Sequence, residues 1–177
     1  MTVTLEGRRP LVAEVQSLLT PSAGGSPRRT VSGVDAARVN MLLAVLQRRA
    51  RFALAQDDCY VATVGGVRLS EPASDLAVAV AVASAKLSAP VPQGMIAVGE
   101  LGLAGEVRPV PGIGRRVREA ARLGFTRALV PRSPEPLGEV PAGFTVAEVG
   151  SIGEALATIP TWTGGGPAAH PEAGPGR

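Results

Sequence analysis

Residues 76–87, LAVAVAVASAKL, form a helix-length run that is apolar on every side except at Ser84 and Lys86. A helix of this kind has no polar face to turn toward water, so it has to be buried nearly all round. Ala77 and Ala81 lie on one side of it and let another element approach closely. The run is far shorter than the ~20 residues that a membrane span needs. The rest of the chain must therefore supply the elements that enclose this helix.

Strands and helices are predicted on both sides of the run. Apolar and polar residues alternate over residues 2–19 around a Gly-Arg-Arg-Pro turn, which predicts a β-hairpin. Residues 20–33 combine Pro, Gly and Ser and are expected to form an exposed loop. Further strands are predicted over 59–64, 67–69, 95–98, 106–110, 128–131 and 144–149, and helices over 34–50, 113–123 and 152–159. Alternation of the two types predicts a two-layer α/β domain.

Length and composition favour one domain followed by a tail. The chain has 177 residues, of which 45% are hydrophobic, enough for a real core. We predict N-terminal strands and a loop over residues 1–31, a domain over 32–160 and a disordered Pro/Gly tail over 161–177, where apolar content is too low for packing. No cleavable leader is visible at the start, and we expect a cytoplasmic protein without membrane contact.

The residues that precede the apolar run raise the question of a nucleophile at a helix start. A Ser-His-Asp triad needs a packed histidine, and the single one, His170, lies in the predicted tail. A Ser-Lys dyad needs a lysine within reach, but Lys86 would lie roughly 18 Å from Ser74 along the same helix. We therefore interpret Ser74 as a helix N-cap and Asp75 as a favourable charge in the first turn.

Metal and phosphate sites have little support in the sequence. Cys59, the only cysteine, is expected in the core, and one cysteine with one histidine cannot form a usual zinc site. Neither a G-x-x-x-x-G-K-[ST] phosphate loop nor a G-x-G-x-x-G fingerprint at a strand-helix junction occurs. The nearest sequence is GIGRR at 112–116, a glycine-punctuated helix start whose two arginines could hold a phosphate.

The basic residues permit a nucleic-acid partner. The formal net charge is +3, and all but one of the 18 basic residues are arginine. We select as candidate DNA-binding residues Arg28, Arg29, Arg48, Arg49, Arg115, Arg116, Arg118 and Arg122. The alternative is a solvated helix face in which Glu119 pairs with Arg115 and Arg122, with Arg48 and Arg49 favoured by the helix dipole. Aromatic residues make up only 3% of the chain, so we expect contact with the DNA backbone rather than base stacking.

Four stretches carry a resemblance to a known family: SGVDAARVNMLLAVLQRR, GGVRLSEPASDLAVAVAVASA, GELGLAGEVRPVPGIGRRVREAARLGF, and VP at 130–131. From Ser32 onward the sequence resembles the C-terminal domain of the RadA (Sms) family of bacterial DNA repair proteins. That domain is itself similar to the proteolytic domain of Lon proteases. The resemblance implies a two-layer Lon-like fold, preceded by the β-hairpin and followed by the disordered tail.

The resemblance also implies roles. The Ser and Lys positions of the Lon dyad fall on Ala73 and Gly114, so this chain is expected not to be an enzyme, and the phosphate loop is absent. ATP, Mg and Zn are expected only in a zinc finger and a RecA-like ATPase core ahead of this domain. The family implies a homohexameric ring that drives branch migration on single-stranded or branched DNA beside the recombinase machinery. The Lon-like domains would help hold the ring and bind DNA.

Two other hypotheses remain open at this point. The domain could be purely an oligomerisation module whose arginines lie at subunit interfaces or in solvent. It could also retain a hydrolase activity that uses Ser74 or Ser70.

Overall fold

The structure is a computed structural model that describes residues 1–7, 9–133 and 136–159. Its elements alternate along the chain, which confirms the α/β class. In order they are β1 (Thr2–Glu6), β2 (Arg9–Ala13), β3 (Val15–Pro21), β4 (Arg29–Ser32), α1 (Ala36–Arg49), β5 (Asp57–Thr63), η1 (Val64–Gly66), η2 (Pro72–Ser74), α2 (Asp75–Leu87), β6 (Met95–Ala97), β7 (Glu100–Leu101), β8 (Val107–Arg108), α3 (Ile113–Arg122), β9 (Arg127–Pro131), β10 (Thr145–Val149) and α4 (Ile152–Thr158).

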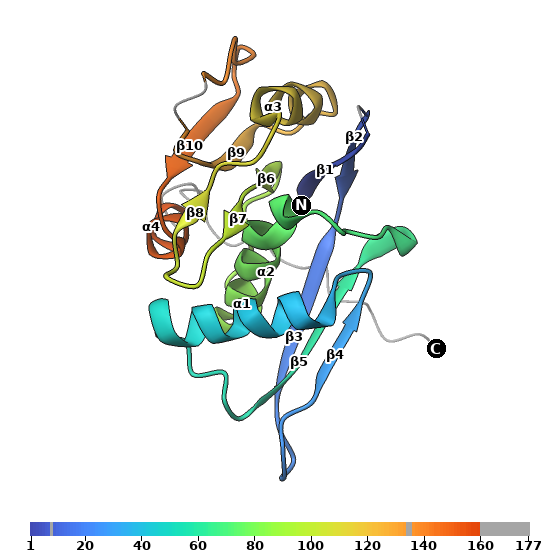
Figure 1. Cartoon of the computed structure of the whole chain (residues 1–177), viewed down its shortest axis with the longest axis vertical. Helices are drawn as coiled ribbons and strands as arrows, with labels where there is room; N and C mark the ends of the chain where they lie inside the picture. Colours follow the sequence, from blue (N-terminus) through green and yellow to red (C-terminus); the bar gives the residue numbers. More distant parts are fainter. Residues whose placement is uncertain (8, 134–135, 160–177) are drawn as a thin grey trace, which may run out of the picture.

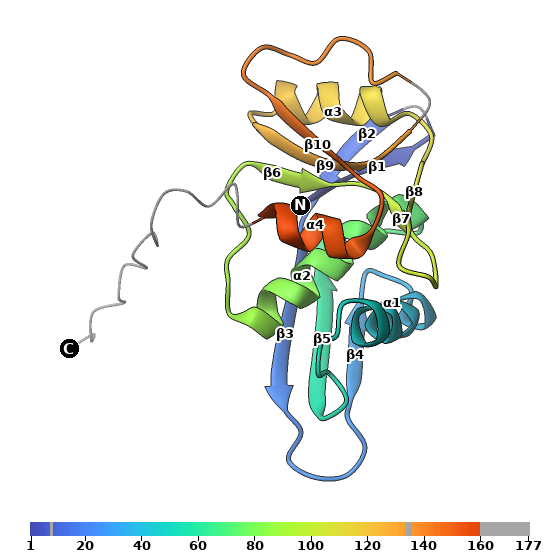
Figure 2. The same ribbon diagram turned by 90° about the vertical axis from the view of Figure 1, so that its left-hand side faces the viewer.

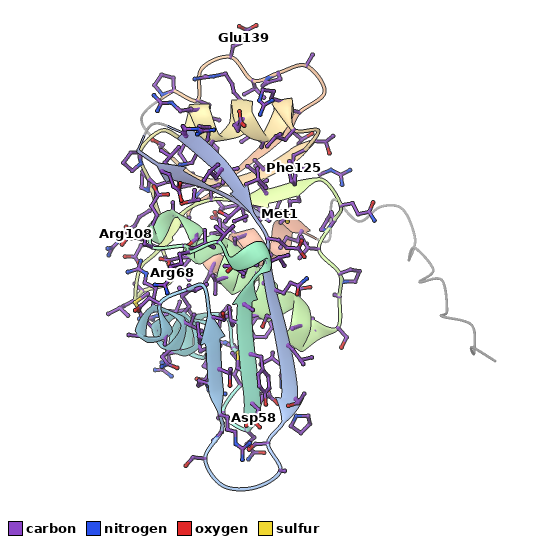
Figure 3. The ribbon with its side chains drawn as sticks, turned by 90° about the vertical axis from the view of Figure 1, so that its right-hand side faces the viewer. Met1, Asp58, Arg68, Arg108, Phe125 and Glu139 are labelled. Carbon is purple, nitrogen blue, oxygen red and sulfur yellow. The ribbon has the colours of Figure 1, made fainter. Side chains whose placement is uncertain are left out.

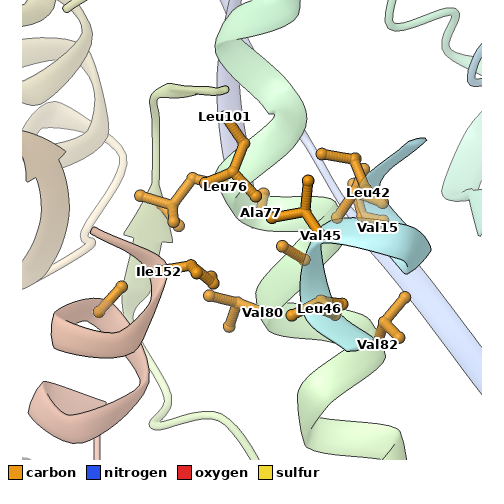
Figure 4. Packing of buried hydrophobic residues seen from close by; sticks show 14 of the residues in the cluster. Val15, Leu42, Val45, Leu46, Leu76, Ala77, Val80, Val82, Leu101 and Ile152 are labelled. Carbon is orange, nitrogen blue, oxygen red and sulfur yellow. The ribbon is translucent and has the colours of Figure 1, made fainter. Parts of the chain in front are cut away.

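The apolar run of the sequence is the central helix α2, as predicted (Figures 1 and 2). It contacts β3, β6, β7 and both α1 and α4, so elements from the whole chain enclose it. Leu76 and Val80 pack in one apolar cluster with Leu46 of α1, Leu101 of β7 and Ile152 of α4 (Figure 4). The all-round burial that the sequence demanded is thus supplied by segments on both sides of the run.

A first sheet has the strand order β3-β5-β4 and is covered on one face by α1 and α2 (Figure 1). β3 runs antiparallel and β4 parallel to β5. Cys59 and Val61 of β5 are buried beneath the helices, and burial raises the pKa of the Cys59 thiol. The prediction of a core cysteine is confirmed.

A second sheet has the order β10-β9-β6, and its three strands are parallel. The β1–β2 hairpin joins it through a hydrogen bond of 3.0 Å from the Ala97 N–H to the Met1 carbonyl. Helix α3 packs Ile113, Val117 and Ala120 into an apolar cluster with Val3 and the strands of this sheet. Since α2 contacts strands of both sheets, the helices are shared between two sheets rather than stacked on one.

Several predicted boundaries are wrong in detail. The hairpin of residues 2–19 is confirmed over β1 and β2, but β3 belongs to the other sheet. The predicted loop over 20–33 contains β4, which pairs with β5 because the chain returns alongside it. Residues 67–69 form no strand, and Leu69 makes only an isolated bridge to Val34. β8 pairs with the short β7, whereas the predicted strand at 95–98 joins the second sheet as β6.

One of the helix caps differs from the prediction. Asp35 caps α1, and its side chain accepts a hydrogen bond of 2.7 Å from the Arg38 N–H. Ser74 precedes α2 but makes no side-chain cap, because its hydroxyl donates instead to the Glu71 carbonyl at 2.9 Å. The start of α2 is therefore held by other contacts.

None of the helices in the described part of the chain has the length and apolar content to cross a membrane. The predicted disordered tail over 161–177 lies outside the described residues. The predicted domain division at residues 31 and 32 stays a prediction.

Truncation of the central helix core tests this packing. Leu76→Ala removes a side chain that is 0% exposed, and the cavity should lower the free energy of unfolding by about 2–5 kcal/mol. Leu87→Ala, on the same helix but 61% exposed, should change it by less than about 0.5 kcal/mol. Urea denaturation followed by circular dichroism measures both, and equal effects would contradict the central position of α2.

Candidate functional site

The two positions that the resemblance to Lon proteases assigns to a Ser-Lys dyad are held by backbone contacts. Ala73 is buried in η2, and its carbonyl accepts a hydrogen bond of 2.8 Å from the Gly99 N–H. Gly114 lies in the first turn of α3, and the Leu137 carbonyl occupies the space that a side chain there would need. A lysine at position 114 would have to displace that backbone. The geometry at these positions gives no support to Ser-Lys chemistry.

The neighbouring serine is also poorly placed for hydrolysis. Ser74 is 3% exposed, and its hydroxyl is engaged with the Glu71 carbonyl. The single lysine, Lys86, forms an ion pair with Asp57 at 2.5 Å at the far end of α2. A nucleophile needs a base within hydrogen-bond reach, and this arrangement offers Ser74 none from Lys86.

An ion pair between Glu71 and Arg116 lies beside these positions and was missed in the sequence. Arg116 is 0% exposed, and its guanidinium contacts both carboxylate oxygens of Glu71. It also donates to the Val3 carbonyl at 2.6 Å and to the Pro111 carbonyl at 3.2 Å. The guanidinium thus joins β1, the segment before η2 and the start of α3 through one group.

The carboxylate of Glu71 is as well satisfied as its partner. It accepts from the Thr4 hydroxyl and from the Leu5 N–H, both at 2.9 Å, in addition to Arg116. Burial would raise the pKa of Glu71, but the hydrogen bonds from Arg116, Leu5 and Thr4 outweigh it and hold this pKa below its usual value. The pair is therefore a charged structural contact in the interior.

A second charged contact holds the start of α2. Asp75 is 2% exposed, pairs with Arg38 of α1, and accepts from the Leu101 N–H at 3.0 Å. Burial raises the pKa of Asp75, and the bonds from Arg38 and Leu101 oppose that rise. Arg38 also approaches Glu100 at 3.4 Å. Asp75 therefore links α1, α2 and β7, where the sequence suggested only a dipole interaction.

The structure separates the eight candidate arginines into three places (Figure 1). One group lies on α3, a second at the end of α1, and a third at the start of β4, toward the opposite end of the molecule from α3. Arg48 and Arg49 of α1 are exposed, as is Arg28, whereas Arg29 is half-buried and donates to the Asp57 and Leu54 carbonyls. The candidates do not form one continuous surface.

Only part of the α3 group is accessible to a ligand. Arg115, Arg118 and Arg122 are exposed, and Arg122 pairs with Glu119 at 2.7 Å. Arg116 is buried, so its selection as a DNA-binding residue is wrong. The sequence already indicated this burial, because helical spacing places position 116 next to Ala120, on the side of the helix that carries Ile113 and Val117.

One place among the described residues has the features of a phosphate site. The start of α3 combines Gly112, an N-cap without a side-chain hydrogen bond, with the exposed Arg115 and Arg118, which is the chemistry that a phosphate group requires. No three His, Cys, Asp or Glu side chains gather as a metal site within the described part. A hollow of about 510 Å³ lies between α2 and β3, and one of about 420 Å³ lies beside Arg38 and Arg108.

Comparison with known proteins places the chain. The model of the family described as ChlI, subunit ChlI of Mg-chelatase, matches residues 44–134, just over half of the chain. The chain belongs to this family. The matched segment contains α2, α3 and the carboxylates of Glu71 and Asp75, whereas Arg38 and the β1 partners lie outside it.

Relatives named DNA repair protein RadA cover most of the chain. The Mycobacterium tuberculosis (strain H37Rv) protein is 54% identical over 156 residues, or 88% of this chain and 32% of the relative. The Mycolicibacterium smegmatis protein is 50% identical over 159 residues, 90% of this chain and 33% of the relative. The Streptococcus pyogenes serotype M1 protein is 44% identical over 159 residues, 90% of this chain and 35% of the relative.

The chain thus spans about a third of the length of these relatives. The resemblance to RadA proteins is confirmed, and the names of the relatives indicate DNA repair. The finer likeness to Lon proteases stays a prediction.

The comparisons correct one expectation. The sequence predicts that the chain is not an enzyme, because it lacks the phosphate loop and has Ala73 and Gly114 at the two positions of the Lon dyad. The ChlI match and the RadA relatives instead point to an ATP-binding region in this chain. The absence of the G-x-x-x-x-G-K-[ST] phosphate loop does not exclude ATP binding, because backbone N–H groups at the start of a helix can bind phosphate without that motif.

Removal of the buried guanidinium tests the structural role of Arg116. Arg116→Ala leaves Glu71 partly buried without its partner and should lower the free energy of unfolding by about 3–5 kcal/mol. Arg116→Lys keeps the charge but loses the two-pronged contact, and should give a smaller loss. Arg118→Ala, an exposed control on the same helix, should change stability by less than about 0.5 kcal/mol. Urea denaturation measures all three, and a stable Arg116→Ala variant would refute this role.

The lowered pKa of Glu71 predicts a pH dependence. A carboxyl whose folded pKa lies below its unfolded value stabilises the fold above that unfolded value, 4.5 for glutamate, and the contribution is lost as the pH falls through the folded pKa. Below pH 4.5, the wild-type free energy of unfolding should therefore fall more steeply than that of Glu71→Gln. Urea denaturation over a pH series measures the difference, and parallel curves would contradict the assignment.

Proposed function

We propose that this chain is the Lon-protease-like domain of a RadA-type DNA repair protein, and that it serves as a ring-forming and DNA-binding platform for an ATP-dependent branch-migration helicase. The observation that carries the DNA-binding part is the exposed basic side of α3, formed by Arg115, Arg118 and Arg122. The relatives named DNA repair protein RadA support a role for this surface in DNA repair.

Helix α3 separates its charges by face. Its inner face consists of Ile113, Val117 and Ala120 with the internally paired Arg116, and its outer face carries the remaining arginines. Arginines on one exposed side can contact consecutive phosphates and neutralise their charge, releasing counterions. The exposed pair of Arg122 with Glu119 is no obstacle, because surface ion pairs contribute little and exchange readily.

We assign the zinc finger and the RecA-like core, with their ATP, Mg and Zn, to the two thirds of the RadA relatives that this chain does not match. In that arrangement six copies of the whole protein close a ring in the cytoplasm, and this domain lines one side of it. The recombinase machinery would supply the branched DNA. Phosphate contacts from α3 fix the DNA position and read no base sequence.

Nucleotide binding is a second candidate function, and the ChlI match favours it. In the described residues, the start of α3 is where an uncapped helix end and exposed arginines meet. Equilibrium dialysis of this chain with radiolabelled ATP tests the proposal directly. Retention that is lost in Arg115→Ala/Arg118→Ala supports it, and an equal ATP concentration on both sides of the membrane refutes it.

The salt dependence of DNA binding tests the platform. Fluorescence anisotropy of labelled single-stranded DNA, titrated with this chain between low and moderate salt, should show affinity that falls steeply as salt rises. Arg118→Ala and Arg122→Ala should each weaken binding to all sequences alike and reduce the logarithmic salt slope by about 0.7–1. Arg132→Ala, exposed but outside the candidate set, is the matched control and should leave the slope unchanged.

Two results would decide against this proposal. Absence of wild-type binding at low salt would refute direct DNA contact by this chain. A changed assembly mass in the α3 variants, with DNA affinity unaltered, would identify these arginines as interface residues of an oligomerisation module.

A further inference from the structure

The first sheet has a second face that none of the helices of residues 1–159 covers. Side chains alternate across a strand, so the residues that flank the buried Cys59 and Val61 point to the opposite side. The register places Leu18 beside Tyr60 and Tyr60 beside Thr30, and it places Gln16, Ala62 and Ser32 in the neighbouring row. We call this set, Gln16, Leu18, Thr30, Ser32, Tyr60 and Ala62, the open face.

The open face is accessible in the described part of the chain. Figure 3 looks onto it, and no described element lies across β3, β5 and β4 on this side. Leu18, on the edge strand β3, is 58% exposed, and Tyr60 is 36% exposed although it lies on the central strand β5. Tyr60 is also the single tyrosine of the chain. An exposed aromatic ring on the central strand of a sheet offers a surface on which a planar group can stack.

The chemistry of the open face favours a nucleic-acid base over a protein partner. Its apolar side chains larger than alanine are Leu18 and Tyr60, and the others are hydroxyls and an amide. A protein interface of useful size has an apolar centre larger than two side chains. A base needs a ring to stack on and nearby hydrogen-bonding groups, which Thr30, Ser32 and Gln16 supply.

Charge at the rim of the open face is also suitable for a phosphate backbone. Arg28 is exposed and precedes Thr30 by two residues, so it follows the same side of the sheet at about 7 Å along the strand. Its backbone N–H donates to the Asp58 carboxylate at 2.8 Å, which fixes the chain there. A second acidic group, Glu14, lies beside the open face and accepts a hydrogen bond of 2.8 Å from the Gln16 amide. Arg68 lies at the upper rim (Figure 3).

We propose that the open face binds single-stranded nucleic acid, with a base stacked on Tyr60 against Leu18 and the adjoining phosphate held by Arg28. This site is distinct from the arginines of α3, although its relevance rests on the proposed DNA-binding function. The site would bind a base by stacking, which the low aromatic content of the sequence argued against. One correctly placed ring is nevertheless sufficient to stack one base.

Replacement of the ring tests the proposal in the whole 177-residue chain. The probe is fluorescein-labelled oligo-dT, read by anisotropy at low salt, with an abasic oligonucleotide of equal length and charge beside it. Tyr60→Ala should weaken oligo-dT binding by about 5- to 100-fold, because stacking on one side chain has that value per base. Tyr60→Phe should stay within about twofold of the wild type, since its ring remains.

The controls separate stacking from folding and from charge. Leu123→Ala removes an exposed apolar side chain elsewhere and should leave affinity unchanged. Thermal melting shows whether each variant is folded. Tyr60→Leu, which removes the ring but keeps a large apolar side chain, provides the same test if Tyr60→Ala melts early. Tyr60→Ala should not alter the binding of the abasic probe, whereas Arg28→Ala should weaken both probes.

Each failure has a separate meaning. Steep salt-dependent binding with no effect of Tyr60→Ala or Tyr60→Leu overturns the open-face proposal and leaves the α3 platform standing. A wild-type dimer that Tyr60→Ala converts to a monomer, with DNA affinity unchanged, assigns the face to a second copy of this chain and overturns the proposal. No oligo-dT binding by the wild type refutes both DNA proposals.

Discussion

The burial of α2 on all sides is the constraint on which the rest of the structure depends. A helix made almost wholly of Ala, Val and Leu cannot lie at a surface, so strands of both sheets, two helices and β7 have to meet around it. That requirement brings the segment before residue 40 and the segment after residue 95 together across the core. Within the described part of the chain, it also leaves one face of the first sheet and one face of α3 uncovered. Both proposed binding surfaces are these uncovered faces.

Two interior ion pairs fix the ends of this arrangement. Glu71 and Arg116 join β1, the turn before η2 and α3, while Asp75 and Arg38 join α2 to α1 and β7. Buried charges are costly unless they are paired and hydrogen-bonded, and here backbone groups add to both pairs: the Leu5 N–H donates to Glu71, the Leu101 N–H donates to Asp75, and the Val3 carbonyl accepts from Arg116. The residues around the Lon dyad positions thus form contacts within the fold.

The sequence predicted the elements that have a strong pattern and missed those that depend on distant partners. The enclosed helix, the α3 face and the core cysteine followed from periodicity, because a helix or strand face is set by nearby residues. The division of the strands between two sheets did not, since pairing of β3 with β5 joins residues far apart in the chain. Arg116 shows a third case: its charge suggested DNA contact, while its position in the apolar spacing indicated burial. The position of Tyr60 at the centre of an open face followed only from the register.

Nuclear magnetic resonance of the arginine side chains tests the central claim most directly: exposed arginines contact DNA while Arg116 serves the fold. Addition of single-stranded DNA to the ¹⁵N-labelled chain should shift the Nε–Hε signals of Arg118, Arg122 and Arg28. The signal of Arg116, held by Glu71 and by the Val3 and Pro111 carbonyls, should stay in place. A shift of Arg116 together with the others, or no shift of any arginine at saturating DNA, would contradict the account.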